Sequence, residues 1–306
     1  MRKIFFDEKL ENEFLSKSFI TVPLLSNEEV EYLLAEMYQL NPSDNYSPQG
    51  TYHATFLDAN VDYKKKATNI VRDFFSEKLN NILVDYQFPT GGFLVKQPDC
   101  GEVPMHRDWT FAEHLNQTNI NFWCALVDVD ESNGALQMVA GSHKLVQNIE
   151  APQSMPFYLE FSESLKEIST LVPLKKGEAI FFESSTLHWS TPNNSKNVRQ
   201  AASLLCIPAE AKPVFYFPAQ DFPNKKFNMY EMVNDAFDEH IGTDYFEGNL
   251  KTKVLACVEN KNVEVSKEDF LSMLKNGEKI RQNIYCSHQS SQPTFWEKLK
   301  NYLKMS

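Results

Sequence analysis

Residues 119–129, NINFWCALVDV, alternate in a way that favours a strand. The apolar positions Ile120, Phe122, Cys124 and Leu126 recur with a period of two, so they share one face of an extended chain. The intervening positions point to the opposite face. We therefore predict a strand with one face buried in a core and the other available for a second role.

Similar short runs recur between residues 85 and 217, separated by turn signals such as ESNG (131–134) and LKKGE (174–178). Many short strands at this spacing predict a sandwich or barrel instead of alternating β/α units. The other runs are GGFLVKQP (91–98), ALQMVA (135–140), TLVPL (170–174), AIFFESS (179–185), RQAASLLCIP (199–208) and KPVFYFP (212–218).

Helical patterns lie on both sides of this region. Ser26 and Glu29 form a capping-box signature before an apolar helical pattern, and a second pattern covers about residues 63–83. Later helices are expected at 228–241, 266–277 and 293–305. The fold class predicted is α+β: one domain over 1–306, with a mainly helical part (1–84), a double-sheet β core (85–217) and a mixed, partly helical extension (218–306).

Composition narrows the possible partners and the compartment. The chain has 306 residues and a net charge of −11, which argues against nucleic acid or an anionic membrane as the main partner. The five cysteines are scattered without a C-x-x-C pair, as expected for free thiols in a reducing compartment. No apolar run is long enough for a signal peptide or a membrane span. We expect a cytoplasmic protein, of unknown oligomeric state.

The segment PMHRDWTF (104–111) places His106 and Asp108 two residues apart. Alone, this spacing fits an ordinary polar pair on a strand equally well. A mononuclear non-haem iron site needs two imidazoles and one carboxylate on one side of the metal, leaving positions for a bidentate oxoacid and O₂. A jelly roll meets this need when a second histidine comes from a distant strand, and His188 follows a buried strand at 179–182.

A cation for the far carboxylate of a 2-oxoacid is the next requirement. Arg199 lies eleven residues beyond His188, on what reads as the next antiparallel strand. Arginine suits this task because its planar guanidinium can bind a carboxylate with two parallel hydrogen bonds. Ser190 can add a hydroxyl donor to the same carboxylate.

Residues 93–208 resemble the phytanoyl-CoA dioxygenase family of iron(II)/2-oxoglutarate-dependent oxygenases. The resemblance rests on three blocks in order: MHRD, then FWCALVDVDESNGALQMVAGSHK, then LKKGEAIFFESSTLHWSTPNNSKNVRQA. Two positions depart from the family pattern. Ala140 replaces a usual proline, and Glu178 replaces a frequent aspartate.

The resemblance implies a double-stranded β-helix, the cupin-like jelly roll, as the core. It implies that His106, Asp108 and His188 bind Fe(II), and that Arg199 and Ser190 hold the distal carboxylate of 2-oxoglutarate, with O₂ as the second cosubstrate. Because Asp108 is present, the third protein ligand is in place and hydroxylation is favoured over halogenation.

Further candidates surround these residues. Lys96 matches a position where the family often carries a polar or basic residue, although a strand-edge lysine explains it too. Asn121 should face the barrel mouth and is a candidate cosubstrate contact. Trp109, Phe111 and His53 are candidates for lining the substrate pocket, against plain packing as the alternative.

The function predicted is a 2-oxoglutarate-dependent dioxygenase that hydroxylates a small metabolite, such as an amino acid, acyl compound or natural-product intermediate, with release of succinate and CO₂. One alternative is a non-catalytic jelly-roll binding protein. Another is an oxygenase of the same type that performs desaturation, epimerisation or cyclisation, because substrate placement decides the outcome.

Overall fold

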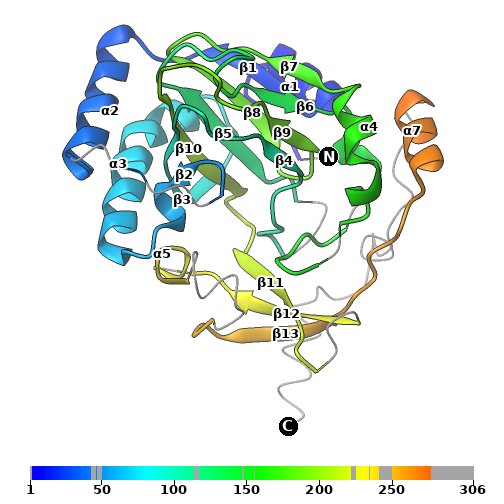
Figure 1. The fold of residues 1–306 in the computed structure, drawn as a ribbon. Coiled ribbons are helices and arrows are strands. Elements are labelled where there is room, and N and C mark those ends of the chain that lie inside the picture. Colours follow the sequence, from blue (N-terminus) through cyan, green and yellow to red (C-terminus); the bar gives the residue numbers. More distant parts are fainter. Residues whose placement is uncertain are drawn as a thin grey trace.

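The computed structural model describes residues 2–42, 46, 50–113, 117–146, 148–154, 156–221, 225–233, 235–240 and 250–276. In this part of the chain two antiparallel sheets pack together as a jelly roll, and a small third sheet lies beyond one end (Figure 1). Helices α2 and α3 cover one side of the larger sheet, while α4 and α7 lie on the opposite side of the molecule (Figure 1).

The bounds of the elements are as follows. The larger sheet contains, in spatial order, β1 Phe19–Pro23, β8 Glu178–Glu183, β5 Ile120–Ala125, β10 Arg199–Pro208, β3 Tyr86–Lys96 and β2 His53–Ala54. The smaller sheet contains β4 Val103–His106, β9 His188–Ser190, β6 Leu136–Met138 and β7 Thr170–Val172. The third sheet contains β11 Val214–Pro218, β12 Lys226–Glu231 and β13 Val254–Glu259. The helices are α1 Glu8–Lys17, α2 Asn27–Leu40, α3 Val61–Asn80, α4 Ser162–Lys166, α5 Ala236–His240 and α7 Lys267–Asn276.

The outer face of the larger sheet packs on the N-terminal helices. Ile120, Phe122 and Cys124 of β5 are fully buried there, and the ring of Phe122 lies 4.7 Å from that of Phe75 on α3. The predicted capping box of α2 is present, because the Glu29 amide donates to the Ser26 hydroxyl and the Ser26 amide donates to the Glu29 carboxylate. The alternation of residues 119–129 therefore marks the strand and its helix-covered face correctly.

The inner face of the same sheet packs on the smaller sheet. Trp123 and Ala125 of β5 join Phe182 of β8 and Met138 of β6 in one buried cluster. Strand alternation thus assigns one face to the helix-packed core and the other to the interior of the roll.

The N-terminal part is mainly helical, as expected, whereas the C-terminal part differs from the sequence expectation. The mainly helical residues 1–84 also supply β1, which pairs with β8 along the edge of the larger sheet. The helix expected at 228–241 is wrong: residues 228–231 belong to β12, which pairs with β11 and β13, and in the described part of this segment only α5 is helical. Pairing on both edges outweighs the helical spacing of a short apolar segment.

Two other expected helices lie in the C-terminal part. Helix α7 agrees with the prediction for 266–277, and its first turn is capped by Ser266, whose hydroxyl accepts from the Asp269 amide at 3.1 Å. The helix expected at 293–305 lies outside the described residues.

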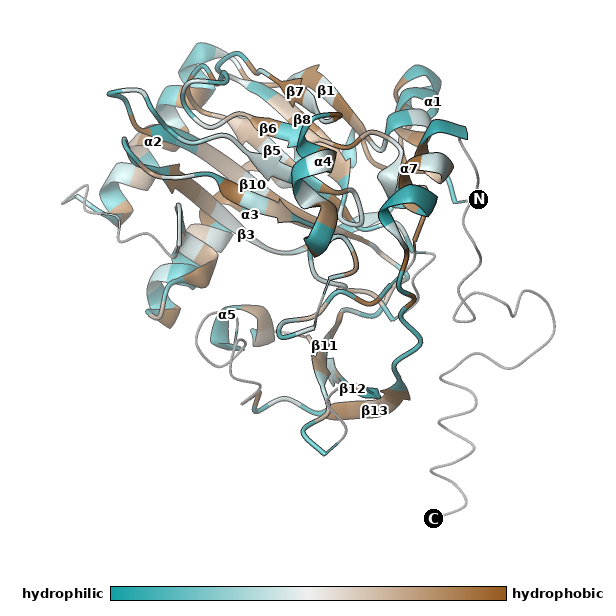
Figure 2. Cartoon of the chain, turned by 45° about the vertical axis from the view of Figure 1, so that its right-hand side comes forward, coloured by the Kyte–Doolittle hydropathy of each residue, from teal (hydrophilic) through white to brown (hydrophobic). Residues whose placement is uncertain are grey.

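Hydropathy follows the same layers. Figure 2 shows apolar residues concentrated on the strands, while α4 and α7 present mostly hydrophilic residues. Within the described residues, none of the helices combines the length and the apolar character that a bilayer crossing requires.

Candidate active site

Three potential metal ligands meet between the two strands that end at the mouth of the roll. His106 ends β4 and His188 begins β9, and these strands pair so that the two residues lie opposite each other, with ring centroids 4.1 Å apart. Asp108 follows two residues after His106. One donor atom from each of the three residues lies within 4.8 Å of the others. The spacing read from the sequence therefore becomes a compact donor cluster.

Backbone carbonyls fix the orientation of both imidazoles. The Nδ1 atom of His106 lies 2.8 Å from the Pro104 carbonyl, and that of His188 lies 2.9 Å from the Thr186 carbonyl. A carbonyl can only accept, so each Nδ1 carries a proton, which leaves each Nε2 as the ring atom that can bind a metal. The Nε2 atoms lie 3.9 Å and 3.8 Å from the carboxylate oxygens of Asp108. This is the orientation of histidines that bind a metal through Nε2.

Burial shifts the pKa values of two residues of the cluster. Burial raises the pKa of Asp108 to about 6, and the neighbouring His106 partly offsets this effect. Burial, together with the nearby His106, holds the pKa of His188 well below its usual value. Two imidazoles and a carboxylate that is costly to charge without a cation nearby fit a divalent metal ion of borderline hardness.

Asn121 lies on the inner face of β5 and holds the carboxylate of the cluster. Its side-chain amide donates to Oδ2 of Asp108 and, at 3.1 Å, to the hydroxyl of Ser184. The Asp108 amide in turn donates to the Ser184 carbonyl at 2.9 Å. The structure thus places Asn121 as a partner of Asp108, and the contact with a cosubstrate stays a prediction.

Replacement of Asn121 by alanine should weaken divalent metal binding about 10- to 100-fold, because the carboxylate loses the donor that fixes its orientation. Titration with Co(II), followed by its visible absorbance, measures the change. The exposed Asn69→Ala change on α3 is a matched control. Unchanged Co(II) affinity in Asn121→Ala would contradict this role.

Two buried cations lie side by side at the closed end of the same space. Arg199 and Lys96 are opposite each other on β10 and β3, with exposed fractions of 2% and 0%. The Lys96 ammonium donates to the Ser190 hydroxyl at 3.1 Å and to the Thr191 carbonyl. The Arg199 guanidinium lies over the Trp123 ring, and its Nε makes no hydrogen bond to any described residue. A buried, under-satisfied guanidinium beside a hydroxyl is suited to an anionic ligand.

Gly134 permits this close approach of the cations. A Cβ atom built on Gly134 would lie 2.9 Å from Cδ of Lys96 and 3.6 Å from Nε of Arg199, and the residue has a φ of +103°. The ESNG segment therefore does more than turn the chain, since its glycine covers the cation pair. The sequence indicated only the turn.

Two connected cavities extend from the donor cluster. The first, the inner chamber of about 110 Å³, runs from the cluster to Arg199 and Ser190. The second, the outer chamber of about 290 Å³, opens on the other side and is lined by Trp109 and Phe111. The two chambers share six lining residues: Tyr52, Phe56, His106, Asp108, Asn121 and Ser203.

Tyr52 and His53 are neighbours with different positions. Tyr52 lines both chambers, and burial raises the pKa of its phenol to about 12, so it stays neutral. His53 is buried but lines neither chamber, and its ring lies 5.3 Å from that of Tyr46 and 6.2 Å from that of Tyr63. The sequence analysis selected His53 and missed Tyr52, because Tyr52 belongs to no motif whose spacing would mark it.

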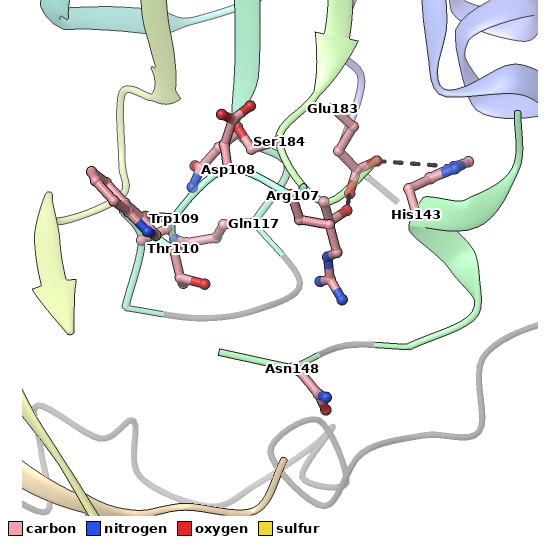
Figure 3. Close-up of a pocket in the computed structure, with 12 residues that line it drawn as sticks. Arg107, Asp108, Trp109, Thr110, Gln117, His143, Asn148, Glu183 and Ser184 are labelled. Carbon is pink, nitrogen blue, oxygen red and sulfur yellow. Dashed lines mark hydrogen bonds and ion pairs between the residues drawn. The ribbon is translucent and has the colours of Figure 1, made fainter. Parts of the chain in front are cut away.

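A small polar recess lies behind Asp108 (Figure 3). The Arg107 side chain points into it, away from Trp109, and its guanidinium lies 3.5 Å from the buried carboxylate of Glu150. His143 lies across the recess, with its Nε2 atom 3.9 Å from Glu183. Arg107 thus extends into the recess and also lines the outer chamber, between the two residues of the donor cluster that flank it in sequence.

Comparison with known proteins agrees with this geometry. The phytanoyl-CoA dioxygenase (PhyH) family model matches residues 19–201. A phytanoyl-CoA dioxygenase domain-containing protein 1 homolog of Dictyostelium discoideum is 31% identical over 144 residues, which cover 42% of this chain and 51% of that protein. Phytanoyl-CoA dioxygenase 1 of Oryza sativa subsp. japonica is 30% identical over 122 residues, covering 39% of this chain and 43% of that protein. The chain spans about half the length of these curated relatives.

A solved structure shares the fold. The epimerase SnoN in complex with Fe³⁺, alpha ketoglutarate and nogalamycin RO matches with a TM-score of 0.50 and 22% identity, over 67% of this chain and 85% of that one. At this identity the match supports the jelly-roll fold and not the reaction. Together with the family match over more than half of the chain, the fold and the motif order lead to one conclusion: this chain belongs to the phytanoyl-CoA dioxygenase family.

Proposed function

We propose that this protein is an Fe(II)- and 2-oxoglutarate-dependent dioxygenase that hydroxylates a small molecule, with His106, Asp108 and His188 as the iron ligands. The observation that carries the proposal is the donor cluster at one end of the inner chamber and the Arg199–Lys96 pair at the other. A cluster alone would fit many metals. The buried cation pair across a small chamber adds a site for the far end of a dicarboxylate.

The residues fit the two groups in charge and in donor type. Both Nε2 atoms and the carboxylate of Asp108 face a common point, as three ligands of ferrous iron require. Arg199 and Ser190 would hold the distal carboxylate of 2-oxoglutarate, with Lys96 adding a second positive charge. When bound, iron supplies O₂ activation coupled to decarboxylation of 2-oxoglutarate to succinate and CO₂.

The chain itself contributes orientation and exclusion of water. Asn121 fixes the Asp108 carboxylate, and the two carbonyl contacts fix the imidazoles. Trp123 and Phe182 line the inner chamber with apolar surface, so the charged groups there act in a medium of low polarity. The outer chamber then holds the substrate beside the ligand cluster.

The proposal is tested by mixing the purified protein anaerobically with Fe(II) and 2-oxoglutarate. We expect a visible metal-to-ligand charge-transfer band that needs both additions, followed by succinate formation on exposure to O₂. A protein that binds Fe(II) but gives neither the band nor succinate would be a non-catalytic binding protein instead.

Lys96 should make 2-oxoglutarate binding depend on pH. Burial, and then the neighbouring Arg199, lowers the pKa of Lys96 to about 8. A dicarboxylate favours the charged ammonium, so affinity is full below this pKa and falls as pH rises through it. The Kd of 2-oxoglutarate, measured by titration of the charge-transfer band, should rise several-fold from neutral pH to about pH 9. In Lys96→Met this rise should disappear, whereas the exposed Lys175→Met should keep it.

The cysteines and the net charge bear on the compartment and on the kind of partner. The described cysteines, Cys100, Cys124, Cys206 and Cys257, are free thiols. This supports a reducing compartment, and we propose the cytoplasm. The acidic charge of −11 supports a small molecule as the partner instead of nucleic acid or a membrane surface.

A further inference from the structure

We propose that the hydroxyls of Tyr52 and Ser203 position the 2-oxoacid cosubstrate, as hydrogen-bond donors to its 1-carboxylate at the junction of the two chambers. The inference rests on the proposed function, because the ligand is the cosubstrate of that reaction. Three observations carry it: the place of both residues in the cavity, the availability of both hydroxyls, and the hydrogen bonds that already occupy the neighbouring donors.

Ser203 marks the boundary between the chambers along β10. Arg199, Ser203 and Leu205 share the inner face of this strand, because side chains alternate. Arg199 lines the inner chamber and Leu205 lines the outer one, whereas Ser203 lines both, as His106 and Asp108 do. A ligand that extends from Arg199 to the donor cluster therefore ends beside Ser203.

The Tyr52 phenol reaches the same junction from the segment before β2. Tyr52 precedes His53 and Ala54, which pair with β3, and it lines both chambers. Burial first, and then the charge of Asp108, raise the pKa of Tyr52 to about 12, although the charge of Arg199 lowers it. The phenol therefore keeps its proton at neutral pH, and it lies within electrostatic reach of both ends of the inner chamber.

Both hydroxyls are available to a ligand. Neither Tyr52 nor Ser203 makes a side-chain hydrogen bond to a described residue. Both side chains are half-buried, and both face the cavity, so their oxygens stay accessible from the chambers. Each hydroxyl can donate one hydrogen bond without breaking another within the described part of the chain.

The other donors close to the donor cluster are occupied. The side-chain amide of Asn121 donates to Asp108 and, at 3.1 Å, to Ser184. The indole N–H of Trp189 donates to the Ser169 hydroxyl at 3.0 Å. Neither of these groups can donate to a cosubstrate without losing a bond that holds the site together.

The remaining neutral donors lie at the other end of the inner chamber. The Trp123 ring lies under the Arg199 guanidinium, 5.3 Å from its carbon to the ring centroid. The Ser190 hydroxyl accepts from the Lys96 ammonium at 3.1 Å. These groups are placed for the distal carboxylate, which leaves Tyr52 and Ser203 for the end of the ligand at the donor cluster.

A bound 2-oxoacid needs such donors. When it chelates a metal through its keto oxygen and one carboxylate oxygen, the second oxygen of the 1-carboxylate keeps partial negative charge. Trp123 and Phe182 contribute apolar surface to this chamber, where an unpaired charged oxygen is costly. A neutral hydroxyl that donates to a carboxylate makes a strong, charge-assisted hydrogen bond.

The test is an anaerobic titration of the Fe(II)-loaded full chain with two oxoacids, followed by the charge-transfer band. One is 2-oxoglutarate, and the other is 2-oxopentanoate, which has the same carbon chain without the distal carboxylate. Tyr52→Phe and Ser203→Ala should each raise the Kd of both oxoacids about three- to thirtyfold. Arg199→Met should weaken the binding of 2-oxoglutarate alone.

The band itself gives a second readout. In Tyr52→Phe and Ser203→Ala it should move to shorter wavelength, because the lost donor no longer stabilises the charge that shifts onto the oxoacid. Co(II) affinity without oxoacid should stay unchanged, since neither hydroxyl bonds a residue of the donor cluster. The exposed Tyr38→Phe on α2 and Ser16→Ala on α1 are the matched controls and should change neither Kd nor band.

Unchanged Kd values and an unmoved band in both variants would overturn the proposal. A loss confined to 2-oxoglutarate, with the band in place, would overturn it too, because the hydroxyls would then serve the distal carboxylate. Failure of the proposed function gives a different result, since the unmodified chain would itself show no band. If the unmodified chain shows the band and the variants match it, this inference fails alone.

Discussion

Asp108→Ala should abolish the Fe(II)–2-oxoglutarate charge-transfer band and lower succinate formation by more than about 100-fold. Removal of Asp108 leaves two imidazoles, which hold ferrous iron poorly without the carboxylate charge. The effect should exceed that of Asn121→Ala, because Asn121 only orients the group that Asp108 supplies. Anaerobic absorbance and bound iron, measured after gel filtration, give the two readouts.

The matched control for Asp108→Ala is Asp62→Ala, which removes an exposed carboxylate from the first turn of α3. It should leave the band and the bound iron unchanged. If Asp108→Ala keeps the band and turns over as the unmodified chain does, the iron site lies elsewhere.

Arg199→Met should raise the Kd of 2-oxoglutarate by roughly 30-fold to several-thousand-fold, which corresponds to about 2–5 kcal/mol for a buried charge pair broken on one side. The apolar side chain preserves much of the stem volume between β3 and β5, so the fold should survive. Metal binding should hardly change, because Arg199 lies across the inner chamber from the donor cluster. Titration of the charge-transfer band gives the Kd, and Co(II) titration gives the metal affinity.

Arg72→Met on the outer helix α3 is the matched control for Arg199→Met. Thermal unfolding of both variants separates a lost contact from a lost fold. A Kd within a few-fold of the unmodified chain, in a folded Arg199→Met protein, would assign the distal carboxylate to another group.

Short-range sequence patterns predicted the central strand and the main residues of the candidate site. The alternation at Ile120, Phe122 and Cys124 marked the strand, and it placed Asn121 on the opposite, inward face. The order of His106, Asp108, His188 and Arg199 along the chain identified residues that the fold brings together. Both succeed because they depend on strand periodicity and strand pairing, which are regular in an antiparallel sheet.

What the sequence did not show depends on contacts between distant segments. Asn121 contacts Asp108 through side chains that only the folded sheet brings together. The segment 228–241 has helical spacing, yet residues 228–231 pair as part of β12 with strands on either side. Such pairings are set by the whole chain and not by local periodicity.

The third sheet supports the wall of the outer chamber from behind. The ring of Phe215 on β11 contacts those of Trp109 and Phe111, which line the outer chamber, and none of the described residues of the third sheet belongs to the donor cluster. Replacements in the third sheet should therefore change the shape of the outer chamber and leave the three proposed iron ligands in place.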